Sequence, residues 1–261
     1  MIRALFFDVD GTLVSFRTHR VPDSAREALL RAHARGVRLF VATGRTASNL
    51  TPLAGLPFDG VVALNGASCH TADGALIACR PIPPEAFERV MALSEELGFE
   101  VMLELDEGEF VARTSPAIEE LFRLVDLPAP RVADLRERFS HGDCCQLCLF
   151  LDTETERRVM EQVPELIAAR WHPAFADVNP RGVDKATGMR TFMERFGLAP
   201  DEVMAFGDGG NDTAMLRAAG IGVAMGNACA EAREAADHTT SSVDDDGILR
   251  ALVRFGVIDE H

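Results

Sequence analysis

The chain has 261 residues, of which 47% are hydrophobic and 26% are charged, the composition of an ordinary globular protein rather than a disordered, collagen-like or coiled-coil chain. Its 26 basic and 41 acidic side chains leave a formal net charge of −15, so the molecule as a whole repels polyanions, and nucleic acid is not an expected partner. Any phosphate site must therefore rest on a local cation, a metal ion or backbone N–H groups.

The first 80 residues alternate between strand and helix signals. Short apolar runs at residues 4–7, 37–42 and 61–64 predict three buried strands. Between the first two runs, Ser24 and Glu27 have the spacing of a capping box, which predicts a helix that ends near residue 36. Continuous apolar strands separated by a helix indicate a parallel sheet that is covered on both faces.

The same alternation returns after residue 180. Further helices and strands are predicted in turn at residues 185–196, 203–206, 212–219, 221–224, 228–236 and 248–255. Gly197 and Gly220 are expected to end the first two of these helices. The two α/β stretches together predict one doubly wound, Rossmann-like parallel sheet core made of residues 1–80 and 181–261.

Residues 81–180 form a predicted insertion into this core. A proline-rich segment leads into it, and a helix is expected next, at residues 84–97. Strands are predicted at residues 100–105, 109–112 and 146–152, and the segment Pro128-Ala129-Pro130 is expected to be a loop. These signals predict a separate α+β domain inserted into the first.

Two acidic residues, Asp8 and Asp10, follow the first predicted strand where the chain turns. Both are expected at the carboxyl edge of the sheet, where α/β folds bind ligands. Carboxylates so close repel each other, and a divalent cation is the simplest compensation. One acid can then attack a substrate while its neighbour transfers protons. The alternative is an acidic turn in which Gly11 supplies an unusual φ angle.

Two further positions suit a bound phosphoryl group. Thr43 and Gly44 follow the second predicted strand, where a hydroxyl and exposed N–H groups can hold a phosphoryl oxygen, although Thr-Gly is also a common turn. Lys185 stands at the start of a predicted helix. A lysine there is usually a solvated surface charge, but a phosphate site in so acidic a chain needs a cation.

The segment Gly207-Asp208-Gly209-Gly210-Asn211-Asp212 is a glycine-rich acidic turn between a predicted strand and a helix. Its carboxylate and amide oxygens suit a hard cation, and its glycines permit close approach of the backbone. The remaining ligands of an EF-hand loop are missing. A turn in which Asn211 or Asp212 caps the helix is the alternative interpretation.

Together, these four elements resemble the motifs of the haloacid dehalogenase-like (HAD) hydrolase superfamily in its phosphatase form. They occur in the expected order, as Asp8-x-Asp10-Gly11-Thr12, the strand-terminal Thr43, Lys185, and Gly207-Asp208-x-x-Asn211-Asp212. The insertion and three other segments resemble the Cof-type subfamily (type IIB): Leu64-Asn65-Gly66-Ala67, residues 179–185, and Met225-Gly226-Asn227-Ala228. The resemblance implies that the inserted domain is a large α+β cap of the C2B type.

The resemblance implies an Mg²⁺-dependent mechanism. Asp8 would attack phosphorus to form an aspartyl-phosphate, and Asp10 would protonate the leaving oxygen and then deprotonate the hydrolytic water. Thr43 and Lys185 would bind the phosphoryl oxygens. The implied metal set is Asp8, Asp10 through its backbone carbonyl, Asp208 and Asp212, the last also able to support Lys185. The implied phosphate and substrate contacts are Gly11, Gly44, Asn65, Gly66 and Asn211.

A cap that closes over the site fits small phosphomonoesters, and the resemblance implies sugar phosphates, hexose phosphates first. Four polar or aromatic residues of the insertion have no motif behind them and are expected to have ordinary surface or packing roles: Arg113, His141, Trp171 and His172. We expect no obligate protein partner.

Several alternatives stay open at this point. Asp10 disfavours a dehalogenase, but a phosphomutase or phosphotransferase of the same superfamily shares the nucleophile. A non-enzymatic phosphoaspartyl switch is a further hypothesis. The acidic run at residues 244–246 is expected to cap the following helix rather than to bind a metal or a partner.

The cysteines and the apolar runs bear on location. No apolar run approaches the roughly 18 residues of a membrane-spanning helix, and the N-terminal run is too short for a signal peptide. Six scattered cysteines without such a signal predict reduced thiols and a cytoplasmic location. Cys145 and Cys148 have the spacing of half a zinc site or a redox pair, but on a strand they face opposite sides, which favours structural roles.

Overall fold

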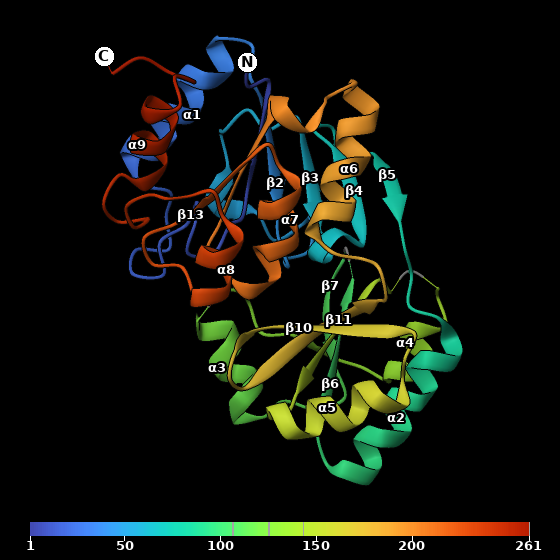
Figure 1. The fold of residues 1–261 in the computed structure, drawn as a ribbon. Helices are drawn as coiled ribbons and strands as arrows, with labels where there is room; N and C mark the ends of the chain where they lie inside the picture. Colours follow the sequence, from blue (N-terminus) through green and yellow to red (C-terminus); the bar gives the residue numbers. More distant parts are fainter. Residues whose placement is uncertain (106, 125, 143, 261) are drawn as a thin grey trace.

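The structure is a computed structural model that describes residues 1–105, 107–124, 126–142 and 144–260, and for Trp171 the backbone alone. The described strands form two sheets that lie in two lobes (Figure 1). The first lobe contains both chain ends, and the chain between β5 and α6 builds the second lobe. This architecture confirms the predicted Rossmann-like α/β core with an added α+β part.

Eight of the described strands form the first sheet, in the order β14-β13-β12-β1-β2-β3-β4-β5. Their bounds are β1 (Ala4–Phe7), β2 (Arg38–Ala42), β3 (Gly60–Ala63), β4 (Ser68–Thr71), β5 (Leu76–Cys79), β12 (Val203–Gly207), β13 (Ile221–Ala224) and β14 (His238–Thr239). Neighbours from β14 to β3 are parallel, whereas β4 and β5 add an antiparallel hairpin at one edge. The strand order reverses beside β1, which creates a crevice at the carboxyl ends of β1 and β12.

Helices cover both faces of the first sheet, which explains its continuous apolar strands. In β1, Leu5 and Phe7 pack with α1 (Asp23–Ala34) and α9 (Gly247–Arg254). The alternate residues of β1 pack on the opposite face with three other helices: α6 (Lys185–Phe196), α7 (Thr213–Ala218) and α8 (Ala230–Ala235). Within the described residues, none of the helices combines the length and apolar character that crossing a membrane requires.

The second sheet has the order β10-β11-β9-β6-β7-β8. Its strands are β6 (Glu100–Leu105), β7 (Gly108–Val111), β8 (Arg131–Val132), β9 (Gln146–Phe150), β10 (Leu166–His172) and β11 (Phe175–Pro180). The helices that accompany it are α2 (Pro84–Leu97), α3 (Pro116–Leu124), α4 (Leu135–Phe139) and α5 (Thr153–Gln162).

The two faces of the second sheet differ in what they contact. Residues of α2, α4 and α5 pack on one face with Val101 and Leu103 of β6. Residues of α3 pack on part of the other face with Met102. Because side chains alternate along a strand, Glu104 also points to the face of Met102, and both line a cavity that faces the first lobe.

Two capping predictions are wrong. The helix α1 begins at Asp23, and its N-cap is Pro22, so Ser24 lies inside the first turn and makes no capping-box bond. The carbonyl of Pro22 already accepts the N–H of Arg26 at 3.0 Å, which starts the helix before Ser24 could cap it. Asp246 occupies the N-cap of α9 at φ +59°, but its side chain makes no capping bond.

Candidate active site

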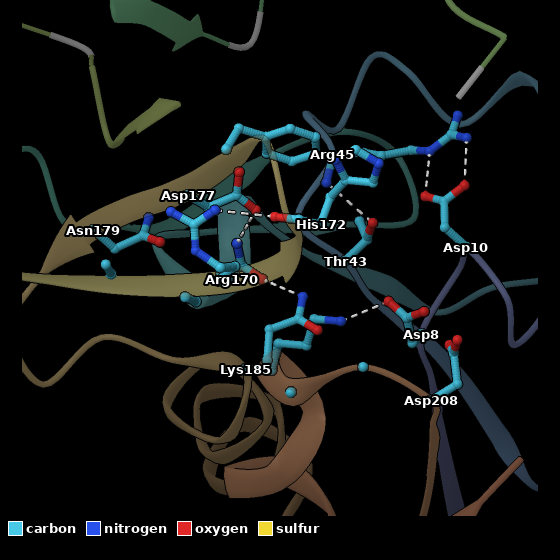
Figure 2. A pocket seen from close by; sticks show the side chains of 18 of the residues that line it. Asp8, Asp10, Thr43, Arg45, Arg170, His172, Asp177, Asn179, Lys185 and Asp208 are labelled. Atoms are coloured by element: carbon cyan, nitrogen blue, oxygen red, sulfur yellow. Dashed lines mark hydrogen bonds and ion pairs between the residues drawn. The ribbon is translucent and has the colours of Figure 1, made fainter. Parts of the chain in front are cut away.

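Three predicted site residues follow the carboxyl ends of adjacent parallel strands. Asp8 follows β1, Thr43 follows β2 and Asp208 follows β12. Since β1 pairs with both β2 and β12 in parallel register, the three residues meet at one edge of the sheet. Figure 2 shows Asp8 between Asp208 and Thr43, with Lys185 pointing toward Asp8.

Lys185 is the first residue of α6 and lies fully buried at this edge. Its Nζ atom donates to Asp8 Oδ1 at 2.5 Å and to Asp212 Oδ1 at 2.6 Å. The side chain of Asp184 caps the helix by accepting the N–H of Thr187 at 2.7 Å, which fixes where α6 begins. Burial disfavours the ammonium charge, but the carboxylates of Asp212 and Asp8 raise the Lys185 pKa, so Lys185 is a cation inside the site.

Asp212 organises the loop that carries Asp208. One oxygen of Asp212 accepts Lys185, and the other accepts the N–H groups of Asp208 at 2.9 Å and Gly209 at 2.8 Å. Thr12 holds the Asp208 carboxylate from the other side through a 2.9 Å bond to Oδ1. The Asp212 side chain therefore fixes the backbone of this loop and makes no capping bond to the helix α7.

Gly11 makes the close approach of two loops possible. Its φ angle is +86°, a conformation that residues with a Cβ atom rarely adopt. A Cβ atom there would lie 2.3 Å from Asp208 Oδ2. The Asn227 side chain bridges the same two loops by donating to the Gly11 carbonyl at 2.8 Å and to Asp208 Oδ2 at 3.3 Å. Asn227 lies in a segment that the sequence singled out, but its contact was not predicted.

Asp8, Asp208 and Asp212 form a compact acidic group. Each offers one carboxylate oxygen, and these atoms all lie within 4.8 Å of one another. Burial raises the pKa of Asp8 well above its ordinary value and that of Asp208 to about 7, and neighbouring carboxylates add to both shifts. Lys185 supplies one positive charge against three carboxylates. This oxygen-rich, negatively charged group fits a divalent cation.

Asp10 is held apart from that group by Arg45. The guanidinium donates from Nε to Asp10 Oδ2 at 2.8 Å and from Nη2 to Asp10 Oδ1 at 2.7 Å (Figure 2). The Arg45 side chain is only 7% exposed. Its backbone N–H donates to Thr43 Oγ1 at 3.0 Å, so one residue orients two predicted catalytic groups. No role was predicted for Arg45, although its position two residues after Thr43 was the available sequence signal.

Asn65 and Asn211, two predicted substrate contacts, are bonded to each other. Asn211 Nδ2 donates to Asn65 Oδ1 at 2.9 Å. Asn65 Nδ2 in turn donates to Gln146 Oε1 and to Asp177 Oδ2, both at 3.0 Å. Gln146 Nε2 reaches back to the Gly44 carbonyl at 3.0 Å. This network joins the first lobe to β9 and β11 of the second lobe, and all of its members except the buried Gln146 line the cavity.

Gly66, the remaining predicted contact, has a packing role in the structure. It has φ +100°, and a Cβ atom there would lie 1.9 Å from the carbonyl oxygen of Asp184. The absence of a side chain thus lets the start of α6 lie against the turn after β3. This contact places Lys185, the next residue, at the carboxyl edge of the sheet.

A cavity of about 1060 Å³ lies between the two lobes above Asp8. Its second-lobe wall includes the acidic residues Glu104, Glu109 and Asp177 and the apolar residues Met102 and Phe175. Burial raises the pKa of Glu104 and of Glu109, and for Glu104 the charge of Asp177 adds to the rise. A sequence signal for this wall was available on β11. Asp177 and Asn179 are two positions apart with the apolar Val178 between them, so both polar side chains lie on the same face of the strand.

The four candidate residues of the insertion lie in different surroundings. Arg113 is 80% exposed and lies 3.9 Å from Glu100, and His141 is exposed, so both have the expected surface positions. His172 lines the cavity and stacks on Phe175 with ring centroids 5.1 Å apart. The side chain of Trp171 is outside the described residues.

The chain matches one known family along almost its whole length. A family model described as haloacid dehalogenase-like hydrolase matches residues 5–252. The putative phosphatase YkrA of Bacillus subtilis is 32% identical over 259 residues, which cover 98% of each chain. The HMP-PP phosphatase of Shigella flexneri is 28% identical over 245 residues, which cover 91% of this chain and 89% of the relative.

Solved structures extend the likeness to both lobes. The HAD phosphatase BT1666 of Bacteroides thetaiotaomicron superposes with a TM-score of 0.93 at 48% identity, covering 99% of this chain and 96% of that one. The HAD subclass IIB sugar phosphatase BT4131 superposes with a TM-score of 0.92 at 38% identity, covering 98% of this chain and 100% of that one. The similarity therefore includes the second sheet as well as the first.

Proposed function

The chain belongs to the haloacid dehalogenase-like hydrolase family, in its Cof-type subclass IIB, and is a phosphatase; from this premise we propose that it hydrolyses small phosphomonoesters, sugar phosphates of hexose size first, through an aspartyl-phosphate on Asp8. The observation that carries the proposal is the buried Asp8 carboxylate, held by Lys185 at 2.5 Å on the floor of a large cavity. The reduced thiols expected from the sequence support a cytoplasmic location.

In the proposed first step, an Asp8 oxygen forms a bond to phosphorus and the ester P–O bond breaks. Asp10 gives its proton to the leaving oxygen, and Lys185 and Thr43 bind the phosphoryl oxygens. In the second step a water attacks phosphorus, Asp10 accepts its proton, and the bond from phosphorus to Asp8 breaks. Arg45 holds Asp10 in one orientation through its two bonds, so we propose it as a positioning residue.

The compact acidic group supports Mg²⁺ as the cofactor. Asp8 and Asp208 would hold it with their carboxylates, and Asp10 with its backbone carbonyl. Asp212 belongs to the group as well, and its bonds to the Asp208 loop and to Lys185 favour a supporting role. When bound, the ion neutralises carboxylate and phosphoryl charge, which lowers the barrier to attack by one anion on another.

We propose that residues 81–180 act as a cap on the core made of residues 1–80 and 181–261. The cavity between the lobes is enclosed on one side by the cap and on the other by the catalytic edge of the core. A cap that covers Asp8 excludes bulk water and selects the leaving group by contacts on its inner face.

The inner face of the cap favours leaving groups rich in hydroxyls. Glu104, Glu109 and Asp177 present carboxylates to the cavity, and carboxylates accept hydrogen bonds from hydroxyl groups. Where these groups are ionised, their charges repel leaving groups that carry a carboxylate or a further phosphate. A neutral sugar satisfies these conditions better than an organic acid or a nucleotide, and the relative BT4131, a sugar phosphatase, supports the same class.

The proposal is tested by inorganic phosphate release from three substrate sets, with and without Mg²⁺. The sets are hexose phosphates, phosphorylated organic acids of similar size, and nucleotides. We expect Mg²⁺-dependent release, with the highest kcat/KM for a hexose phosphate. Highest kcat/KM for a phosphorylated acid contradicts the substrate class. Transfer of phosphate to a sugar acceptor indicates a mutase or phosphotransferase, and a stable phosphoprotein without turnover indicates a switch.

A further inference from the structure

Two cysteines from different sheets meet at the junction of the lobes. Cys79 is the last residue of β5, at the edge of the first sheet, and Cys145 directly precedes β9 in the second sheet. Their Sγ atoms lie 2.8 Å apart, although 66 positions separate them in the sequence. Since the S–S bond of a disulfide is about 2.05 Å long, the two sulfurs need only a short approach to bond.

The surrounding contacts place Cys145 at the point where the chain crosses between lobes. The crossing runs from β5 to α2, and the N–H of Ile82 within it donates to the carbonyl of Cys144 at 2.8 Å. Asn179 Nδ2 donates both to the Cys145 carbonyl at 3.0 Å and to the Leu64 carbonyl at 3.1 Å. Cys145 therefore packs against both lobes, and a bond from it to Cys79 would tie them together beside this crossing.

The two thiols differ in access to solvent. Cys79 is exposed, whereas Cys145 is only 1% exposed. A small-molecule disulfide therefore reacts with Cys79 first and forms a mixed disulfide there. The buried Cys145 sulfur lies next to Cys79 and can then attack this mixed disulfide from the protein interior. Cys148, which the sequence spacing pairs with Cys145, packs in a different cluster on the face of Met102, so the spacing does not identify the partner.

We propose that Cys79 and Cys145 form a reversible disulfide that restrains the cap and slows turnover. A small-molecule disulfide such as oxidised glutathione supplies the oxidising equivalents. Its S–S bond breaks as a mixed disulfide forms on Cys79 and one thiol leaves. The Cys145 sulfur then bonds to Cys79 and releases the second thiol, so two protein thiols are oxidised and one disulfide is reduced to two thiols.

The restraint acts on the movement that the proposed function requires. A substrate that is enclosed between cap and core enters and leaves only when the lobes separate. The new bond adds a covalent link across the junction, which limits that separation. Burial raises the pKa of the Cys145 thiol, so the second exchange step is slow near neutral pH and accelerates as the pH rises.

Oxidation of the full-length protein tests the proposal. The protein is incubated with oxidised glutathione, alkylated without reduction, and analysed by intact mass and peptide mapping. We expect a product that is lighter than the reduced protein by two hydrogen atoms, with the Cys79 and Cys145 peptides joined. We also expect it to lose most of its hexose phosphatase turnover and to recover it with dithiothreitol.

Three variants locate the bond. Cys79→Ser and Cys145→Ala should each prevent the internal crosslink and retain turnover after the same oxidation without dithiothreitol. Cys148→Ala is the matched control, since it removes the neighbouring buried thiol and should crosslink like the parent. A persistent mixed disulfide on Cys79, a different crosslink, or the predicted crosslink with unchanged turnover overturns the proposal.

The loss of turnover rests on the proposed phosphatase function, but the crosslink does not. If the reduced protein releases no phosphate from any substrate, the proposed function fails. Peptide mapping still tests the bond in that case. The rate of hydrogen exchange in the segment between β5 and α2 then measures whether the bond restrains the two lobes. Faster exchange there in the oxidised protein contradicts a restraint.

Discussion

Asp8 and Asp10 are only two residues apart, but the structure gives their carboxylates different partners. Asp8 is buried against Lys185 and close to Asp208, whereas Asp10 is bound by both arms of the Arg45 guanidinium. The carboxylates therefore differ in environment, which is the condition for one to act as nucleophile while the other transfers protons.

The substitution Asp8→Asn should abolish turnover while the fold is retained. An amide has the size of the carboxylate but does not attack phosphorus, and it removes one negative charge from a crowded acidic group. We expect no phosphate release above the blank and a melting temperature at or above that of the parent. Substantial residual turnover with the best substrate would exclude Asp8 as the nucleophile.

Asp10→Asn should slow turnover by about 10²–10⁴-fold, the usual contribution of a positioned acid or base. The loss should be larger for a sugar leaving group than for a phenol that leaves without protonation. The measurement is kcat for a hexose phosphate and for an aryl phosphate in both proteins. Equal losses for the two substrates contradict the acid role.

Arg45→Lys tests positioning, because lysine keeps the charge but cannot form the two-armed contact with Asp10. A hydrogen bond to a charged group contributes roughly 1.5–3 kcal/mol, which corresponds to a loss of about ten- to a hundredfold in kcat. We expect KM to change little. A raised KM with an unchanged kcat indicates instead that Arg45 binds substrate.

At the scale of elements, the site depends on close contact between α6 and the turn after β3. Gly66 permits this contact, because any side chain there meets the Asp184 carbonyl at the start of the helix. The helix start carries Lys185, so the packing of two backbone segments sets the position of a catalytic cation.

Gly66→Ala should therefore destabilise the protein and lower its activity together. The control is Gly36→Ala: Gly36 has φ +83°, but nothing lies within 4 Å of its added Cβ atom. The left-handed conformation alone costs roughly 1–2 kcal/mol, and the Gly66 variant should lose clearly more in urea unfolding. Equal losses in the two variants would show that the contact with α6 imposes no steric demand.

The elements also show what sequence patterns can predict. The strands β1, β2, β3, β12 and β13 are apolar on both faces, and their runs identify them within one or two residues. The hairpin of β4 and β5 was not predicted. It lies at the edge of the sheet, β4 contains mostly polar residues, and the apolar residues of β5 are partly exposed, so neither strand has a continuous buried apolar run. In the second sheet, β10 and β11 were missed because polar side chains that face the cavity interrupt their apolar pattern.

The site shows the same limit. Asp8, Thr43 and Asp208 could be expected at one edge from the sequence because parallel strands end there, whereas Lys185 starts a helix and reaches that edge through the packing of α6. The contacts from Gln146 and Asp177 depend on how the second lobe lies over the first. No local pattern encodes that placement, so these contacts required the structure.

At the scale of the whole molecule, a cavity with an acidic wall separates the two lobes. Glu104 is half-buried there, and burial and the charge of Asp177 raise its pKa above the ordinary value of 4.5. The folded protein thus holds this proton to a higher pH than the unfolded chain does. The contribution of Glu104 to the free energy of unfolding therefore falls as the pH rises from its ordinary pKa of 4.5 through its raised pKa in the folded protein.

Glu104→Gln should remove this pH dependence. At acidic pH, where the parent carboxyl is protonated in both states, the melting temperatures of variant and parent should be close. At mildly alkaline pH the variant should be more stable, because it buries no charge. The exposed Glu96→Gln is the control and should shift neither value. A variant that is less stable than the parent at alkaline pH contradicts the account.

The central claim is the covalent intermediate on Asp8, and trapping it is the most direct test. The Mg²⁺-loaded protein is quenched in acid during turnover of a hexose phosphate, and borohydride then reduces any aspartyl-phosphate to homoserine. We predict homoserine at position 8 in the parent and not in a sample quenched without substrate. Homoserine at another aspartate, or an Asp8→Asn variant that turns over at the parent rate, would contradict the account.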